Sequence, residues 1–410
     1  MKKWIVVTVL LISIIIAVSG MSMQIGEGMG KVGSESDHSE NVSMEDSLEI
    51  DDPCKSKELQ AEQLYSNQNN TLKILAVGDL MFHMPQVNSA RTINGTYDFT
   101  PPFIYIKDYV LNADLAIANL ETVIAGDEMG FSGYPRFNSP VAVLDAIVET
   151  GFDILVTSNN HGLDKGKVGI EKTIMNITAR GLEYVGTSLD KRRPYVIREE
   201  NGIRIGLMSY TYGLNGLDSL LTDDERDRMI NLIDQDKIAA DIQKLKTENV
   251  DFIIAYMHWG NQYYKNPSKE QKELAGFLSE KGVDLILGTH PHVVQEIEEI
   301  SIGSGRTHVI YSMGNFLSNQ RYDTMGVSST EDGVIFEIII EKNVMEQQTG
   351  VKSIKTIPTW IDRRWNGNSY DYRILPVERA LEGKLDIEID VETMDRLKKS
   401  LSNTIYNLYN

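Results

Sequence analysis

The chain has 410 residues, of which 41% are hydrophobic and 24% charged, and its net charge is −19. The composition is that of a globular protein. The acidic excess argues against a nucleic-acid-binding surface, because phosphate binding needs clustered Lys and Arg. The single cysteine, Cys54, excludes an intrachain disulfide and a Cys-rich zinc or iron–sulfur site. An anionic substrate would therefore need positive charge from another source, for example a metal ion.

The N-terminal segment, residues 1–26, is typical of an export signal. Two lysines precede a run, residues 4–26, that contains no charged residue and begins with a dense apolar stretch. The positive flank should stay in the cytoplasm while the rest of the chain crosses the membrane. Ala17 and Ser19 offer a cleavage site, yet the run is also long enough to span a bilayer. An uncleaved anchor and a cleaved signal both remain open, and either places the protein on the extracellular face of the cell membrane.

Residues 27–70 are acidic, rich in Ser and Asn and poor in aromatic residues. Such a segment buries too little apolar surface to fold alone, so we expect a disordered linker. The remaining residues, 71–410, are numerous enough for a large domain with a well-buried core. Within it, we place the motif-bearing core at 72–320 and further strands and a helix at 321–410.

From Leu72 onward, short apolar runs alternate with longer amphipathic segments. KILAVGD, DILVTSNNH, DFIIAYMHWG and DLILGTHPH are typical of buried strands, and GIEKTIMNITARG and SKEQKELAGFLSEKG of helices. This alternation predicts an α/β domain with largely parallel strands.

Polar side chains follow these apolar runs at the point where each predicted strand ends. The residues concerned are Asp79, Asn119, Glu121, Asn160, His161, His258, His290, His292 and Asn315. In open α/β sheets, ligands bind at the carboxyl ends of the strands. We therefore expect these separate segments to deliver their polar groups to one rim.

Carboxylate, amide oxygen and imidazole form a ligand set that suits Mn, Fe or Zn. Each of these residues also has an ordinary structural interpretation. His258 alone is more typical of a hydrogen-bonded structural histidine, Asp79 could be a turn aspartate, and Glu121 could cap the segment that follows it. The pair His290 and His292 in DLILGTHPHVVQ is more specific, because two imidazoles at a strand end are seldom needed for packing.

Six segments, GDLMFH, NLETVI, SNNHGLDKGKVGI, HWGNQYY, GTHPHVVQ and YSMGNF, closely resemble in order and spacing the CapA family of capsule-synthesis proteins. The resemblance covers roughly residues 72–320. It implies a metallophosphoesterase-like domain, a four-layer αββα sandwich with a metal site at the strand ends. It also implies an extracellular domain, held by an N-terminal anchor and linked to poly-γ-glutamate production. We expect GVIFEIIIEK and VKSIKTIPTWIDR to complete the second sheet, and DVETMDRLKKSLSNTIYNLY to cover its edge.

The resemblance also implies roles for individual residues. The implied metal ligands are Asp79, Glu121, Asn160, His258, His290 and His292. His161 is implied as the acid or phosphate-facing group, beside Asn160. We further expect Asn119, Trp259 and Asn315 to contact the substrate.

The chain departs from the family pattern at three positions. One is Gln262, where the family commonly has Glu two residues after the HWG glycine. Metallophosphoesterases usually carry Asp-x-His in the first motif, whereas here His83 lies four residues after Asp79. Thr289 stands where the Gly-His-His-Pro-His form of the family has a histidine. These departures leave open whether the site holds one ion or two.

Two classes of function remain open. The first is an extracellular metal-dependent hydrolase or transferase that cleaves a phosphoester or an amide of an anionic polymer, with His161 protonating the leaving group. The second is a non-catalytic component of a membrane capsule-synthesis complex that binds poly-γ-glutamate. Both need the same ligands, so the sequence favours neither. Turnover that depends on His161 distinguishes them.

Overall fold

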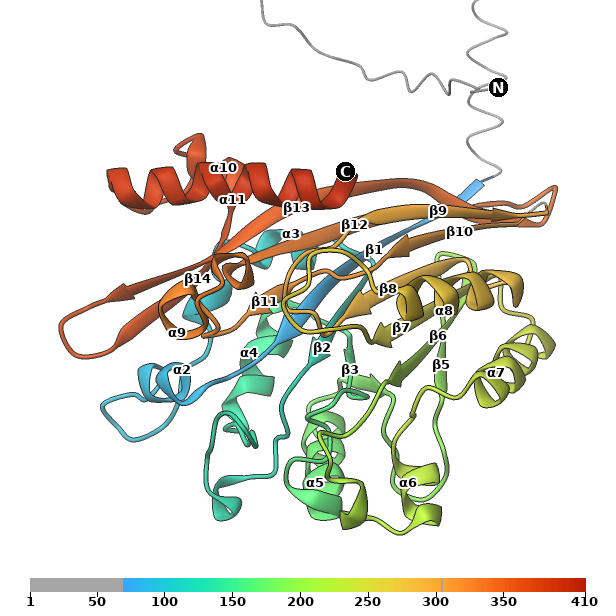
Figure 1. Ribbon diagram of the computed structural model, residues 1–410, viewed down its shortest axis with the longest axis horizontal. Coiled ribbons are helices and arrows are strands. Elements are labelled where there is room, and N and C mark those ends of the chain that lie inside the picture. Colours follow the sequence, from blue (N-terminus) through green and yellow to red (C-terminus); the bar gives the residue numbers. More distant parts are fainter. Residues whose placement is uncertain (1–68, 304) are drawn as a thin grey trace, which may run out of the picture. The chain divides into compact units, whose positions relative to one another are not determined.

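The computed structural model describes residues 69–303 and 305–410 (Figure 1). The expected export segment, residues 1–26, and the expected linker up to residue 68 lie outside the described residues. Strand β1 begins at Asn69, two residues before the predicted start of the domain. Within the described ranges, none of the helices combines the length and the apolar character that crossing a membrane requires.

The described strands form two sheets (Figure 1). The first contains, in spatial order, β14 (Tyr370–Pro376), β13 (Gln348–Trp365), β12 (Asp332–Asn343), β1 (Asn69–Leu80), β2 (Leu115–Leu120), β3 (Ile154–Val156) and β4 (Glu183–Val185), with β11 (Asn315–Leu317) paired to β1. The second contains β5 (Tyr195–Glu200), β6 (Ile203–Thr211), β7 (Phe252–His258), β8 (Leu285–Thr289), β10 (Gly305–Ile310) and β9 (Ile297–Ile302). Strands β1 to β4 are mutually parallel, as are β6, β7, β8 and β10, so each set ends at one edge.

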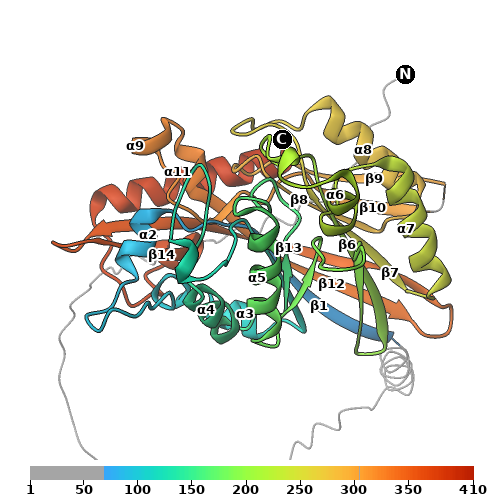
Figure 2. The ribbon, with the colours of Figure 1, turned by 90° about the horizontal axis from the view of Figure 1, so that it is seen from below.

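Among the described residues, the α-helices in chain order are α2 (Met84–Ser89), α3 (Lys107–Leu111), α4 (Ala142–Thr150), α5 (Gly166–Thr178), α6 (Asp223–Met229), α7 (Gln235–Thr247), α8 (Lys269–Glu280), α9 (Tyr322–Met325), α10 (Val377–Leu381) and α11 (Val391–Tyr409). Helices α3 and α4 cover the outer face of the first sheet, and α7 and α8 cover the outer face of the second. Figure 2 shows α3, α4 and α5 grouped together, apart from α7 and α8.

Alternate side chains of each central strand enter different hydrophobic clusters. Ile74 of β1 and Ile254 of β7 belong to one cluster between the two sheets. Leu75 of β1 belongs to a cluster that includes α3 and α4, and Ile253 of β7 to a cluster that includes α7 and α8. The order of layers is helix, sheet, sheet, helix, so the predicted four-layer αββα sandwich is confirmed.

An aspartate directly precedes each of four parallel strands and pairs with the backbone of the neighbouring strand there. Its carboxylate accepts a hydrogen bond from a backbone N–H of the neighbouring strand: Asp114 from Lys73 (2.7 Å), Asp153 from Ala116 (2.7 Å), Asp251 from Arg204 (2.8 Å) and Asp284 from Ile253 (2.7 Å). In each pair the aspartate N–H also donates to the carbonyl of the same residue. The backbone groups at this edge are thereby satisfied, which leaves the opposite edge for chemistry.

The C-terminal strands belong to the first sheet. Strands β12, β13 and β14 extend it in antiparallel order from β1, so the prediction that they complete the second sheet is wrong. Strand β1 is apolar on both faces, which is typical of a strand inside a sheet. Its backbone groups need a hydrogen-bonded strand on each side, and β12 is one of these strands. Helix α11 packs on this extension: Leu408 joins the cluster between the sheets, and Leu397 contacts the cluster of Trp360 and Leu375.

Candidate metal centre

The polar strand-end residues meet between the carboxyl ends of the two sheets. The first sheet contributes Asp79 from β1, Glu121 directly after β2, and Asn160 and His161 after β3. The second contributes His258, the last residue of β7, with His290 and His292 after β8. The expected rim is therefore formed by both sheets together.

One group of potential ligands consists of Glu121, His258 and His290, whose ligand atoms all lie within 4.8 Å of one another. His258 Nε2 is 3.6 Å from Glu121 Oε1 and 2.9 Å from the amide oxygen of Asn160. On the other side of the ring, His258 Nδ1 is 3.0 Å from Thr289 Oγ1. Thr289, which stands in place of a histidine of the family motif, therefore orients the imidazole of His258. The amide oxygen of Asn160 is close enough to be a further ligand of this group.

The second group consists of Asp79, Glu121 and His292, again with ligand atoms within 4.8 Å. His292 Nδ1 lies 3.1 Å from Asp79 Oδ2 and 3.1 Å from Asn315 Oδ1. Its other nitrogen, Nε2, is 3.9 Å from Glu121 Oε1. Asn119 Nδ2 donates to Asp79 Oδ1 at 2.8 Å. Because Glu121 belongs to both groups, its carboxylate lies between two potential cation positions.

Several buried atoms of the centre have no hydrogen-bond partner among the described residues. They are both carboxylate oxygens of Glu121, His290 Nδ1 and His292 Nε2. An unpartnered buried polar group costs about 1–3 kcal/mol. The ion pairs formed by Asp79 and Glu121 within the described part of the chain are with histidines and not with Lys or Arg. A divalent cation would satisfy these atoms and offset the buried charge, so the residues present fit a metal ion.

The protonation of the centre agrees with this fit. Burial, reinforced by Asp79, raises the pKa of Glu121 well above its usual range. Burial and the neighbouring histidines lower the pKa of His258 and of His290 well below the usual value. Both imidazoles are therefore neutral at pH 7, which is the form that binds a metal.

The two histidines after β8 have unusual backbone conformations. His290 has φ of 96° and His292 has φ of 59°, both in the left-handed region. For residues other than glycine, such conformations cost about 1–3 kcal/mol and are found mainly at functional sites. The turn is held from outside by Tyr263, whose N–H donates to the carbonyl of Pro291 at 2.7 Å. Both imidazoles are thereby directed into the centre.

His161 pairs with a carboxylate. Its Nδ1 lies 2.8 Å from Asp164 Oδ2, and both side chains are buried. Asp164 is fixed by two hydrogen bonds, since Phe137 N donates to Oδ2 (2.6 Å) and Arg136 Nε donates to the Asp164 carbonyl (2.8 Å). The sequence indicated His161 but Asp164 was missed; the available signal was its position three residues later in HGLD.

A family model described as "Bacterial capsule synthesis protein PGA_cap" matches residues 73–320. The chain belongs to this PGA_cap family. The Capsule biosynthesis protein CapA of Bacillus anthracis is 26% identical over 285 residues, which cover 67% of this chain and 66% of the relative. The PGA biosynthesis protein CapA of Bacillus subtilis (strain 168) is 24% identical over 293 residues, 67% of this chain and 69% of the relative. The match thus spans about two thirds of each curated relative.

Solved structures with similar folds include phosphoesterases and nucleotidases. The NAD nucleotidase (NadN) of Haemophilus influenzae is 13% identical, with 82% of this chain and 68% of that chain covered and a TM-score of 0.44. The calcineurin-like phosphoesterase YfkN of Bacillus subtilis is 15% identical, with 82% and 98% covered and a TM-score of 0.39. At such values the likeness carries no conclusion about activity.

In this PGA_cap chain the six side chains predicted as ligands lie together in one centre: Asp79, Glu121, Asn160, His258, His290 and His292. Asn119 and Asn315, expected to contact substrate, are fully buried and bond to Asp79 and His292. Both side chains therefore orient ligands, and their contact with a substrate stays a prediction.

Trp259 and His83 lie apart from the ligands. Trp259 is 2% exposed, packs in the cluster that includes α7 and α8, and donates from Nε1 to the Tyr311 carbonyl at 2.9 Å. Successive residues along an extended chain point to opposite faces. Because His258 faces the centre, Trp259 faces the cluster with α7 and α8, and its contact with a substrate stays a prediction. His83 Nδ1 accepts from Asn319 N at 3.3 Å, and neither group of potential ligands includes His83.

The segment after β6 supplies two polar side chains that were missed. Asn160 Nδ2 donates to Asn215 Oδ1 at 3.1 Å. The ring of Tyr212 lies 4.4 Å from that of His290, centroid to centroid. The sequence signal was available, because TYGLN directly follows the predicted strand RIGLMSY.

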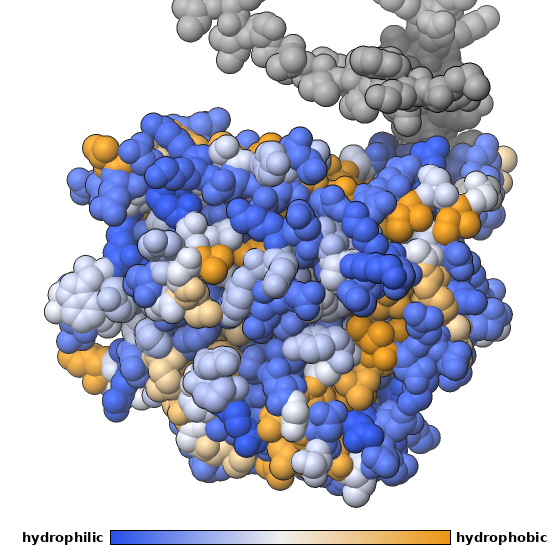
Figure 3. All heavy atoms as spheres, viewed as in Figure 1, coloured by the Kyte–Doolittle hydropathy of each residue, from blue (hydrophilic) through white to orange (hydrophobic). Residues whose placement is uncertain are grey.

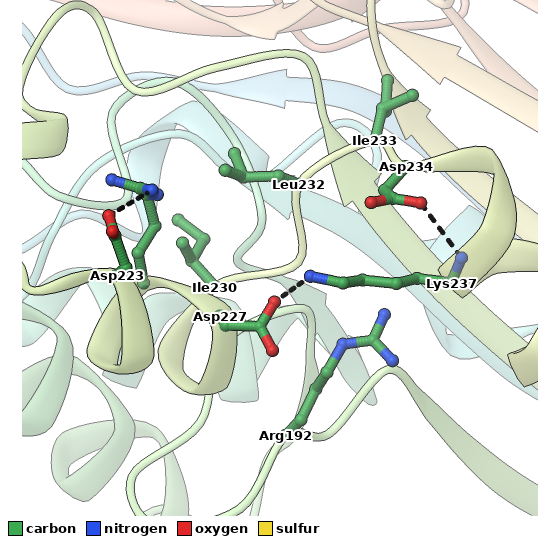
Figure 4. Close-up of a pocket in the computed structure, with 9 residues that line it drawn as sticks. Arg192, Asp223, Asp227, Ile230, Leu232, Ile233, Asp234 and Lys237 are labelled. Carbon is green, nitrogen blue, oxygen red and sulfur yellow. Dashed lines mark hydrogen bonds and ion pairs between the residues drawn. The ribbon is translucent and has the colours of Figure 1, made fainter.

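Elsewhere in the PGA_cap chain, a cavity of about 260 Å³ lies beside α6 and α7 (Figure 4). Its charged groups pair with one another, Arg226 with Asp223 at 2.7 Å and Lys237 with Asp227. Since the charges cancel, the cavity offers no net attraction to an ion. The face of the molecule in Figure 3 is mainly hydrophilic, with separate small apolar clusters, so it presents no large apolar patch.

Proposed function

We propose that this protein acts at the cell surface in the synthesis or export of capsular poly-γ-glutamate, through a metal-dependent hydrolase or transferase site that takes an anionic polymer or a phosphoester. The observation that carries the proposal is the position of Glu121. This fully buried carboxylate has no hydrogen-bond partner among residues 69–303 and 305–410, and it belongs to both ligand groups. The printed names of the family and of its curated relatives, which refer to capsule or PGA biosynthesis, support the biological role.

The proposed metal is Mn, Fe or Zn, as one or two ions. Glu121, His258, His290 and Asn160 would hold one ion, and Asp79, Glu121 and His292 the other. The first set is richer in nitrogen and the second in oxygen. A bound divalent cation polarises a phosphoryl or carbonyl oxygen and makes a nearby water molecule more acidic.

The proton transfer falls to His161. Asp164 accepts the Nδ1 proton of His161, which fixes the orientation of the ring and leaves Nε2 to exchange a proton with the leaving group. The dyad is buried and held by Phe137 N, so the imidazole keeps this orientation while substrate binds.

The proposed location and partners rest on the sequence of residues 1–26 and on the family. Two lysines followed by an uncharged apolar run support export, with the domain on the extracellular face, either anchored or released by cleavage. The proposed partners are the membrane, poly-γ-glutamate and the capsule-synthesis membrane proteins.

Turnover by the metal-loaded protein tests the proposal. The substrates are bis(p-nitrophenyl) phosphate, p-nitrophenyl phosphate and γ-glutamyl p-nitroanilide, and the variants are His161→Gln and a control, His308→Gln. His308 lies on β10, outside both ligand groups. We expect turnover that falls about 100-fold or more in H161Q and stays unchanged in H308Q. If metal-loaded protein turns over none of these compounds, while wild type and H161Q bind poly-γ-glutamate equally, the hydrolase is contradicted in favour of the polymer-binding component.

A further inference from the structure

Tyr212 differs from the ligands of the metal centre in its exposure. Asp79, Glu121, His258 and His292 are 0% exposed and His290 is 3% exposed, whereas Tyr212 is 47% exposed. Its ring is stacked at 6.3 Å on His258 and lies tilted at 4.4 Å from His290. Tyr212 therefore lies between solvent and the position formed by Glu121, His258 and His290.

The sheet fixes the place of Tyr212. It directly follows β6, whose last residue Thr211 pairs with His258 of the parallel strand β7. The backbone N–H of Tyr212 donates to the His258 carbonyl at 3.0 Å. The same loop contributes Asn215, which accepts a hydrogen bond from the Asn160 amide. A side chain held in this way has a defined position relative to the ligands.

The phenol is a neutral donor beside an acidic centre. The ordinary pKa of a tyrosine hydroxyl is about 10, so the hydroxyl keeps its proton at neutral pH. A hydroxyl group donates one hydrogen bond and does not compete with the carboxylates for a cation. The ring of Tyr212 lies beside this position and is partly exposed, so a substrate that enters from solvent on this side passes Tyr212.

We propose that Tyr212 is a substrate-contacting residue, whose hydroxyl donates a hydrogen bond to an oxygen of the phosphoryl or carboxyl group bound at the Glu121, His258 and His290 position. The inference rests on the proposed function, and it adds a neutral donor on the solvent side of the site, apart from the ligands and from His161. The ring of Tyr212 also limits access of water to His290 from this side.

Binding of inorganic phosphate to the metal-loaded protein, measured by titration calorimetry, tests this inference. Tyr212→Phe removes the hydroxyl and retains the ring, so metal content, measured by mass spectrometry, should stay unchanged. The control is Tyr406→Phe on α11, where the tyrosine is also exposed. Loss of one hydrogen bond to a charged group should weaken phosphate binding about tenfold in Y212F and leave it unchanged in Y406F.

The metal measurement separates the two ways in which the test can fail. A wild-type protein that takes up no metal contradicts the proposed metal centre and, with it, this inference. A metal-loaded wild type that binds phosphate as tightly as Y212F does, or that binds none, contradicts the role of Tyr212 and leaves the metal centre standing.

Discussion

Replacing Glu121 with glutamine should change the stability of the metal-free protein and the stability gained from metal in opposite directions. Glu121 is fully buried, and neither of its oxygens has a hydrogen-bond partner among the described residues. Glutamine has nearly the same shape but no charge, and its amide is a poorer ligand for a divalent cation. We expect Glu121→Gln to stabilise the metal-free protein and to abolish most of the stability that metal ions give the wild type.

The direction follows from the raised pKa of Glu121. The folded metal-free protein holds this proton more tightly than the unfolded chain does. Its stability therefore decreases as pH rises from the usual carboxyl pKa through the raised value. Each unit by which folding raises a carboxyl pKa lowers the free energy of unfolding by about 1.4 kcal/mol at a pH above both values. Because glutamine carries no charge, metal-free E121Q should be more stable than the metal-free wild type at pH 8. Metal at a concentration 100 times its dissociation constant raises the free energy of unfolding of the wild type by about 2.7 kcal/mol.

Thermal unfolding at pH 8, followed by circular dichroism with EDTA or with excess Mn²⁺ or Zn²⁺, measures both effects. The matched control is Glu331→Gln, because Glu331 is also buried but its Oε2 accepts from Trp360 (3.0 Å), Arg321 (3.2 Å) and Arg396 (3.2 Å). The free energy of unfolding of E331Q should be about 3–5 kcal/mol below that of the wild type, with or without metal, because two arginines lose a buried partner. The gain from metal should persist in E331Q.

The opposite pattern refutes the reasoning. If metal-free E121Q is less stable than the wild type and both gain equally from metal, Glu121 is an ordinary structural carboxylate and the two ligand groups do not share it.

Three further predictions concern other parts of the chain. Asp164→Asn replaces the carboxylate beside His161 Nδ1 with a neutral amide, which no longer stabilises a protonated imidazole; turnover should fall about 100-fold at unchanged metal content, and undiminished turnover would exclude the dyad. Burial raises the pKa of Asp284 to about 6, so the wild type should lose up to about 2 kcal/mol between pH 4 and 6. Asp284→Asn should lack this loss in denaturant titrations at several pH values, and parallel pH curves for the two proteins would contradict it. A Cβ at Gly288 would lie 2.0 Å from the Tyr311 carbonyl oxygen; Gly288→Ala should therefore lower stability by about 1–3 kcal/mol or more, and an unchanged unfolding midpoint would argue against this close approach.

Much of the fold and the site could be predicted because parallel strands share a direction. An apolar run that ends in a polar residue identifies the carboxyl end of a strand, so Asp79, Glu121 and His258 could each be assigned to a strand end from sequence alone. The four-layer order followed from the family resemblance and was confirmed. The sharing of Glu121 between two ligand groups could not be predicted, because it depends on how one sheet stacks on the other.

The features that the sequence did not predict have identifiable physical causes. Trp259 is adjacent to a ligand in sequence, but the alternation of a strand turns it to the opposite face, into the cluster with α7 and α8. For Asn119 and Asn315 the sequence indicated a place at strand ends but not the hydrogen bonds to Asp79 and His292, which form between separate strands. The C-terminal strands showed their conformation in the sequence but not their partner, since pairing with β1 is a long-range contact.

The metal content of the purified protein, with no His tag, tests the central claim most directly. Wild type and the double variant His290→Ala/His292→Ala are exchanged into buffer with Mn²⁺ or Zn²⁺, freed of excess ion and measured by mass spectrometry. The metal centre predicts about one or two equivalents of metal in the wild type and loss of metal in the double variant. A folded wild type that takes up neither metal, or a double variant that retains the full content, would contradict it.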